Sequence, residues 1–157
     1  LRVNEVRPGD GVAVEGGRPV GRDGHDPRRD TLVTAARLVA APTRSELLAV
    51  VRDQAPRSLS ATWVAVVDVE QGTTLVAGAG APTDGWLGAF VHGASTAASL
   101  SGNDSTQSDV IWAGLEGCGL ALVAGRDRIA WRDRERRQVD ALADIVALRW
   151  VELPDDL

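Results

Sequence analysis

Apolar residues recur every three or four positions in two early segments, which is the spacing of a helix that buries one side. Between residues 31 and 41 this pattern follows Asp30, whose carboxylate is suited to cap a helix N-terminus. Between residues 44 and 54 it follows Thr43, with a glutamate three residues later as in a capping box, and stops before Pro56. The sequence therefore predicts two consecutive helices.

The pattern then changes to an alternation with period two. Residues 61–69 and 73–80 flank one short turn, and residues 109–115 and 120–125 flank another, so we predict two antiparallel hairpins. Segment 61–69 is apolar at nearly all of its odd and even positions. We expect both faces of that strand to be buried, which places it inside the sheet.

The segment between the hairpins, residues 81–108, is the least regular part of this region. Its apolar residues are compatible with a short helix over 85–95. Residues 96–108 are mostly small and polar, and they are expected to form a loop.

The longest helix is predicted over 133–151, with Asp133 as its cap and Pro154 beyond its end. Its apolar residues form two stripes: one of Val139, Leu142, Val146 and Trp150, and an offset one of Ala141, Ile145 and Leu148. One sheet contact needs only one stripe, so the second must be covered by something else. The helix at 31–41 carries a similar surplus in Leu32, Val33, Ala36, Leu38 and Val39.

These elements predict an α+β fold, an antiparallel sheet with the helices near 31–41, 44–54 and 133–151 packed together on one face. Residues 1–29 are rich in Gly, Pro, Arg and Asp, and we interpret them as an extension or short hairpin followed by a linker. The domain is therefore assigned to residues 30–157.

Two stretches of this chain resemble the GAF domain, a small-molecule sensing module of bacterial signalling proteins. Residues 45–80 are similar to the entry helix and first hairpin of that family, and residues 119–150 to its late strand, aromatic turn and closing helix. The chain departs from several GAF subtypes. It has no lysine for the cyclic-nucleotide motif, and only Cys118 where methionine sulfoxide reductases of the family need several cysteines.

Composition limits the possible partners. The chain has 157 residues with 17 basic, all of them arginine, and 22 acidic side chains, for a net charge of −5. This balance disfavours general binding to nucleic acid or anionic membranes. The lack of lysine is typical of GC-rich codon usage and indicates a bacterial source. A single cysteine excludes an internal disulfide and favours a reducing cytoplasm.

The sequence offers no catalytic constellation and no metal or cofactor site. His92 has no second histidine or cysteine nearby, and His25 lies in a charged loop. Cys118 sits between glycines in a predicted turn, where it can be a small hydrophobe or an oxidisable thiol. The aromatic residues can form either an ordinary core or the walls of a small apolar pocket. The residues assigned to such a pocket are Trp63, Trp86, Phe90, His92 and Trp112.

We therefore expect a non-catalytic regulatory module that senses a small ligand or relays a signal through protein contacts. A ligand-free dimerisation scaffold is the alternative. The surplus apolar stripes predict a homodimer through the first and last helices. The interface is assigned to Leu32, Ala36, Val39, Ala141, Ile145 and Leu148. In the competing interpretation, residues 1–29 fold back over the same surface.

Overall fold

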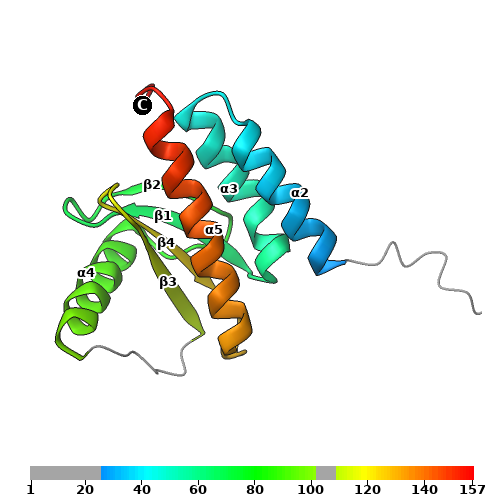
Figure 1. Ribbon diagram of the computed structural model, residues 1–157. Helices are drawn as coiled ribbons and strands as arrows, with labels where there is room; N and C mark the ends of the chain where they lie inside the picture. Colours follow the sequence, from blue (N-terminus) through cyan, green and yellow to red (C-terminus); the bar gives the residue numbers. More distant parts are fainter. Residues whose placement is uncertain (1–25, 102–108) are drawn as a thin grey trace, which may run out of the picture.

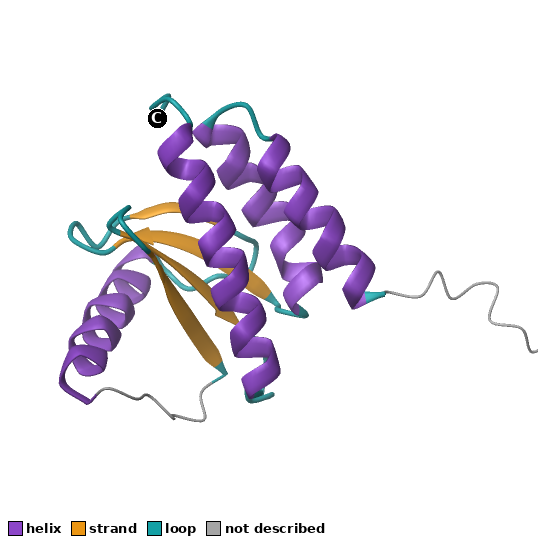
Figure 2. Ribbon diagram, in the orientation of Figure 1, coloured by secondary structure: helices purple, strands orange, loops and turns teal. Residues whose placement is uncertain are grey.

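The computed structural model describes residues 26–101 and 109–157. Along the chain they form α2 (Pro27–Ala40), α3 (Arg44–Leu59), β1 (Trp63–Asp68), β2 (Thr74–Ala77), α4 (Asp84–Ser101), β3 (Val110–Leu115), β4 (Leu120–Gly125) and α5 (Asp133–Glu152). The strands make one antiparallel sheet in the order β2-β1-β4-β3 (Figure 2). The α+β class and both hairpins are confirmed. The hairpin suggested near the N-terminus lies outside the described residues.

The helices lie in layers on the two faces of the sheet. α3 packs on β1 and α5 packs on β3, while α2 packs on α3 and α5 farther from the strands (Figure 1). α4 lies on the opposite face, against β1 and β2. The predicted grouping of the first two helices and the last helix on one side is therefore confirmed.

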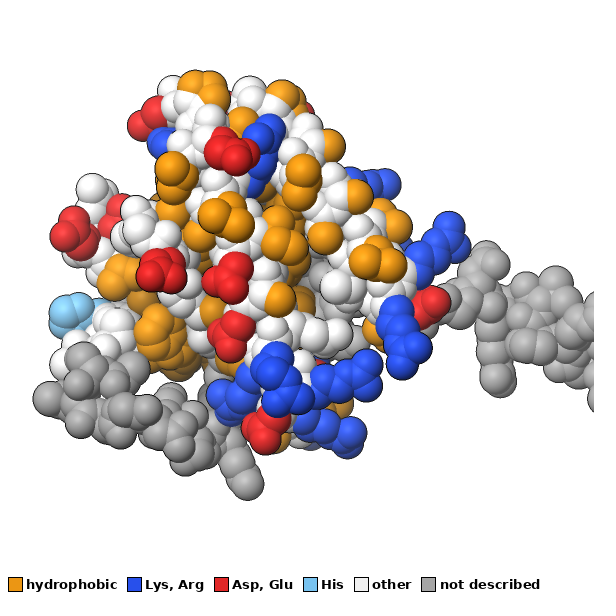
Figure 3. Space-filling model, viewed as in Figure 1, with side chains coloured by type: hydrophobic (Ala, Val, Ile, Leu, Met, Phe, Trp, Pro, Cys, Tyr) orange, Lys and Arg blue, Asp and Glu red, His pale blue; other side chains and the backbone are white. Residues whose placement is uncertain are grey.

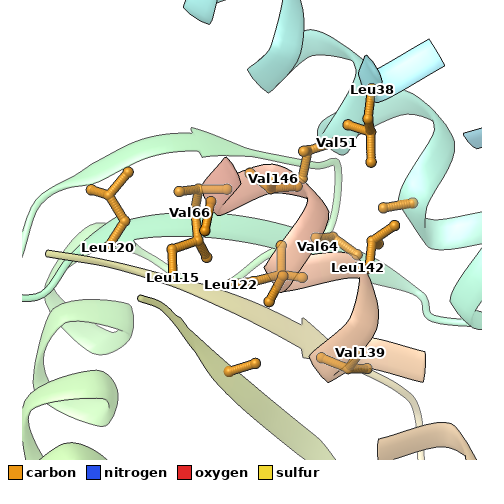
Figure 4. Packing of buried hydrophobic residues seen from close by; sticks show 14 of the residues in the cluster. Leu38, Val51, Val64, Val66, Leu115, Leu120, Leu122, Val139, Leu142 and Val146 are labelled. Atoms are coloured by element: carbon orange, nitrogen blue, oxygen red, sulfur yellow. The ribbon is translucent and has the colours of Figure 1, made fainter. Parts of the chain in front are cut away.

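The alternation of β1 divides the core in two. Val64 and Val66 face α3 and α5, where they join a cluster that includes Val51, Leu122 and Val146 (Figure 4). A second cluster, which packs under α4, contains Trp63, Ala65, Val67, Leu87, Val91, Ala121 and Val123. β1 is hydrogen-bonded on both sides and β4 is buried along its whole length. The prediction of an internal strand with two apolar faces is confirmed.

α2 begins earlier than predicted. Asp26 is its N-cap, with a side-chain oxygen that accepts from the Arg28 amide at 3.0 Å, and Pro27 occupies the first helical position. Proline is favoured there because its missing N–H would have no partner in the helix. Asp30 lies in the first turn instead of capping the helix. Residues 27–29, assigned to the linker by the sequence, are therefore helical.

α3 begins as predicted, with Thr43 Oγ1 accepting from the Glu46 amide at 3.1 Å, but it continues through Pro56 to Leu59. Proline deprives the Arg52 carbonyl of its usual donor. Burial of Ser58 and Leu59 compensates for this loss in the last turn. The prediction that the helix ends before Pro56 was wrong because burial outweighed one missing hydrogen bond.

α4 is also longer than predicted, since residues 96–101 continue the helix instead of starting a loop. The hydroxyls of Ser95 and Thr96 both donate to the His92 carbonyl, at 3.0 and 2.8 Å. Hydroxyl groups that bond back to the preceding turn are compatible with a helix. The polar composition of this segment was therefore a misleading signal.

Candidate functional site

An exposed apolar surface extends over α2 and α5. We call it the α2–α5 face, and it consists of Leu32, Ala36, Val39, Ala141, Ile145, Leu148 and Val151. Leu32 is 72% exposed, Val39 61%, Leu148 71% and Val151 67%. Hydrophobic side chains gather on both helices in the view of Figure 3. Contiguous apolar patches of this kind are characteristic of interaction surfaces.

The two stripes of α5 explain how this surface arises. Val139, Leu142, Val146 and Trp150 are buried against the sheet and α3, as predicted for the first stripe. In the second stripe Ala141 and Leu148 are exposed and Ile145 is half-buried. One member of the predicted surplus on α2 is corrected: Leu38 is fully buried, because it points with Thr34 toward the interior.

A shallow groove joins the two helices. It has a volume of about 230 Å³ and is lined by Val39, Ile145, Leu148, Arg149 and Glu152. α2 and α5 run side by side in the same direction (Figure 1). Arg149 fixes their spacing, since Nη2 donates to the Ala41 carbonyl at 2.7 Å and Nη1 donates to Glu152 at 2.8 Å.

A larger groove of about 560 Å³ lies on the other side of α5, next to the β3–β4 turn. Its lining combines apolar and acidic side chains: Glu116, Asp144, Ala147, Leu148, Val151 and Glu152. Asp140 lies one turn before Asp144. Desolvation raises the pKa of Asp140 above its ordinary value, the nearby Asp144 carboxylate adds to this, and Arg136 acts in the opposite direction. We call this the acidic groove.

Charge is unevenly distributed along the α2–α5 face. Exposed arginines occur where the two helices begin, at Arg28 and Arg29 on α2 and at Arg134 and Arg137 on α5. Asp144 and Glu152, two of the carboxylates of the acidic groove, lie farther along α5, and Figure 3 shows most of the basic side chains gathered at the beginning of the two helices. One copy of the domain therefore carries a basic end and an acidic groove beside a common apolar surface.

Most of the residues assigned to a ligand pocket lie on the α4 side of the sheet. Trp63 is buried, Phe90 and Trp112 are half-buried, and Trp86 is 45% exposed. Trp86 stacks on Phe90 with their ring centroids 5.2 Å apart. His92 is exposed to solvent.

Trp63 also has contacts away from α4. It lines a cavity of about 450 Å³ whose remaining walls come from α3, Thr62 and the end of β2. Its indole also lies across Gly125 on β4, where an added Cβ would overlap the ring. This contact explains why the strand has a glycine opposite a tryptophan.

A buried arginine was missed by the sequence interpretation. Arg126 is only 8% exposed, and its Nη1 donates to Glu135 at 2.9 Å while Nη2 donates to the Leu59 carbonyl at 3.0 Å. Its guanidinium lies 3.7 Å from the ring centroid of Trp131. The hydrogen bond from Arg126 lowers the pKa of Glu135, with partial burial opposing it. Glu135 also accepts from the Arg132 amide and so caps α5.

The remaining candidates for chemistry stand apart from one another. Cys118 is half-buried, with Sγ 3.6 Å from the Ala147 carbonyl oxygen, and desolvation raises the pKa of its thiol. His25 lies outside the described residues. Among residues 26–101 and 109–157 no group of three or more His, Cys, Asp or Glu side chains could hold a metal ion. Within the same ranges no helix is long and apolar enough to cross a membrane.

Comparisons with protein family models, with curated proteins and with solved structures find no match to this chain. The geometry of the α2–α5 face and its charges are therefore the basis for a functional proposal.

Proposed function

We propose that this domain is a non-catalytic regulatory module of the cytoplasm that acts by pairing with a second copy through the α2–α5 face. The observation that carries the proposal is the exposure of large apolar side chains, Leu32, Val39, Leu148 and Val151, on two adjacent helices. A monomer would leave all of them in water. Pairing removes them from water and stabilises the assembly.

The size of the face is suitable for such a contact. α2 has 14 residues and α5 has 20, so at 1.5 Å per residue and about 10 Å of width for each helix the two present a surface of roughly 500 Å². A stable interface of ordinary size buries about 800 Å² on each partner. Polar side chains at the rim of the face contribute the remaining buried area. The resemblance to GAF domains agrees with this proposal, because many of those modules pair through their first and last helices.

Relay through protein contacts is favoured over sensing of a small ligand. Trp63 belongs to the cluster under α4, and Phe90 and Trp112 pack against it, which supports their interpretation as core residues. The Trp63 indole fills the space above Gly125. Native mass spectrometry of the protein after exposure to a metabolite extract tests the sensor alternative, which predicts a bound small molecule.

Sedimentation velocity over a range of protein concentrations tests the pairing. Wild-type protein is expected to dimerise, and Leu148→Glu is expected to be a folded monomer, because it places a charge at the centre of the face. Ile129→Glu is the matched control, since Ile129 is 62% exposed but lies in the loop before α5. It should leave the dimer intact. A wild-type chain that stays monomeric at high concentration would refute the proposal.

Deletion of residues 1–25 distinguishes the competing interpretation. If the N-terminal residues cover the α2–α5 face, the full chain is a monomer and the shortened chain associates. If a second copy covers it, both forms dimerise.

A further inference from the structure

We propose that the two copies pack with their α5 helices antiparallel, related by a two-fold axis that lies between the two helices, perpendicular to them and level with the midpoint between Asp144 and Ile145. This inference rests on the proposed dimer and specifies its geometry. It follows from the distribution of charge on the exposed side of α5. Arg137 is exposed before this point, and Glu152 of the acidic groove lies beyond it, so reversing one helix brings these opposite charges together.

The positions on α5 are self-complementary about this axis. Arg137 and Glu152 lie equally far on either side of it, about 11 Å along the helix at 1.5 Å per residue. Ala141 and Leu148 are likewise equidistant. A two-fold axis therefore sets Arg137 opposite the partner's Glu152, and the small Ala141 opposite the partner's Leu148. Each contact occurs twice because the interface is isologous.

The acidic groove provides the receiving site for the arginine. Glu116, Asp144 and Glu152 contribute carboxylates around an apolar floor that includes Leu148 and Val151. Glu152 already accepts from Arg149 of its own chain at 2.8 Å and its side chain is 64% exposed. An ionised carboxylate accepts several hydrogen bonds, so Glu152 can also accept from a second cation. An arginine is suited to this environment, because its stem packs on apolar surface while its guanidinium meets the carboxylates.

In the alternative arrangement the two-fold axis is parallel to α2 and α5. Each α5 then packs on the partner's α2, and the two helices run in the same direction. That arrangement brings Arg134 and Arg137 near the partner's Arg28 and Arg29, which repel. It would bring Asp144 toward the partner's Arg37 instead. The antiparallel arrangement has one repulsive contact of its own, between the two copies of Asp144 beside the axis. It therefore predicts that Asp144→Asn tightens the dimer.

Mixing two charge-reversed variants tests the geometry. Arg137→Glu alone sets glutamate against glutamate at both contacts, and Glu152→Arg alone sets arginine against arginine. Each homodimer is expected to be about tenfold weaker than wild type, since each change acts twice. A mixture of the two variants restores both attractions in the heterodimer. With one variant labelled with ¹⁵N, native mass spectrometry should find about nine-tenths heterodimer instead of the one half expected from random pairing.

A charge reversal outside the face provides the control. Glu70 is exposed in the β1–β2 turn, so Glu70→Arg mixed with Arg137→Glu should give random pairing. Asp144→Cys in a Cys118→Ser background supplies a second measurement. The antiparallel geometry brings the two introduced thiols together at the axis, and oxidation should yield a covalent dimer.

The outcomes separate the two proposals. A wild-type monomer refutes the dimer itself. A wild-type dimer with random pairing of the variants and no Asp144→Cys cross-link refutes only the antiparallel arrangement. Weakening by Arg37→Glu in that case identifies the arrangement with the axis along the helices.

Discussion

Arg126 provides the sharpest test of what holds α5 in place. Its guanidinium connects three parts of the fold through Glu135 on α5, the Leu59 carbonyl at the end of α3, and the face of Trp131. Replacement by methionine keeps most of the aliphatic stem and removes the charge and the donors. Glu135 then keeps only the Arg132 amide as a donor, and the Leu59 carbonyl loses the donor that Arg126 supplied.

The expected cost is the sum of these losses. Both hydrogen bonds involve the charged guanidinium, and a bond of that kind contributes about 1.5–3 kcal/mol. A cation over an aromatic ring adds about 1 kcal/mol. The methionine side chain recovers part of this by packing on Trp131. We therefore expect Arg126→Met to lower the free energy of unfolding by about 3 kcal/mol, within the range for breaking a buried ion pair.

Urea denaturation followed by tryptophan fluorescence measures this change. Arg52→Met is the matched control, because Arg52 also pairs with a carboxylate, Asp53 at 2.7 Å, but with side chains 45% and 53% exposed. Exposed pairs contribute at most about 1 kcal/mol. A loss for Arg126→Met no larger than that for Arg52→Met would refute the reasoning.

Three further predictions concern stability. The pKa of Glu135 in the folded protein is lowered from 4.5. Its contribution to stability is therefore present above the unfolded pKa and is lost as the pH falls through the folded pKa. In urea titrations at a series of pH values, Glu135→Gln should reduce the loss of stability on acidification. Gly125→Ala introduces a Cβ into the Trp63 ring and should cost about 1–3 kcal/mol in thermal unfolding. Gly114→Ala meets only an ordinary contact at 3.9 Å and should cost much less. Asp140→Asn should stabilise the protein by a few tenths of a kcal/mol at pH 7, because it removes a like-charge pair one turn apart; a decrease in melting temperature would contradict this.

The sheet and the faces of its strands could be predicted because their signal is local. In β1 the residues at both odd and even positions are apolar, which indicates that both faces of the strand are buried. The turns on either side determine the length of the strand. The second apolar stripe of α5 could also be predicted, since the angular offset of Ala141 and Leu148 from Val146 follows from helical geometry alone. Those predictions needed no knowledge of which element packs on which.

The helix ends could not be predicted in the same way. Pro56 alone predicts the end of a helix, yet the turn after it is stabilised by burial of Leu59 and by the hydrogen bond that Arg126 donates to the Leu59 carbonyl. That contact joins residues 67 positions apart in the chain. Similarly, Thr96 was assigned to a loop, whereas its hydroxyl donates to the His92 carbonyl within α4. Such outcomes depend on tertiary contacts that composition does not encode.

The sequence predicted the exposed apolar residues of the α2–α5 face but not the charged groups beside them. Exposure of Leu32, Val39 and Leu148 agrees with their assignment to a surface stripe, while pairing itself stays a prediction. The acidic groove was not anticipated, because Glu116 comes from the β3–β4 turn and meets Asp144 and Glu152 only in the folded chain. The signal within α5 was the exposed spacing of Asp144, Leu148 and Glu152, which recur at every fourth position and therefore lie on one side of the helix.

The position of α2 outside the sheet layer has a dynamic consequence. Of its 14 residues only Thr34 and Leu38 are buried, and its packing is directed to α3 and α5. A helix with so little buried surface opens at a lower free energy than the strands, as a separate cooperative unit. Its amide protons should exchange with solvent well before those of β1 and β4. A partner that binds over α2 should suppress this opening. Slower exchange of the α2 amide protons would then measure the fraction of the α2–α5 face that is bound.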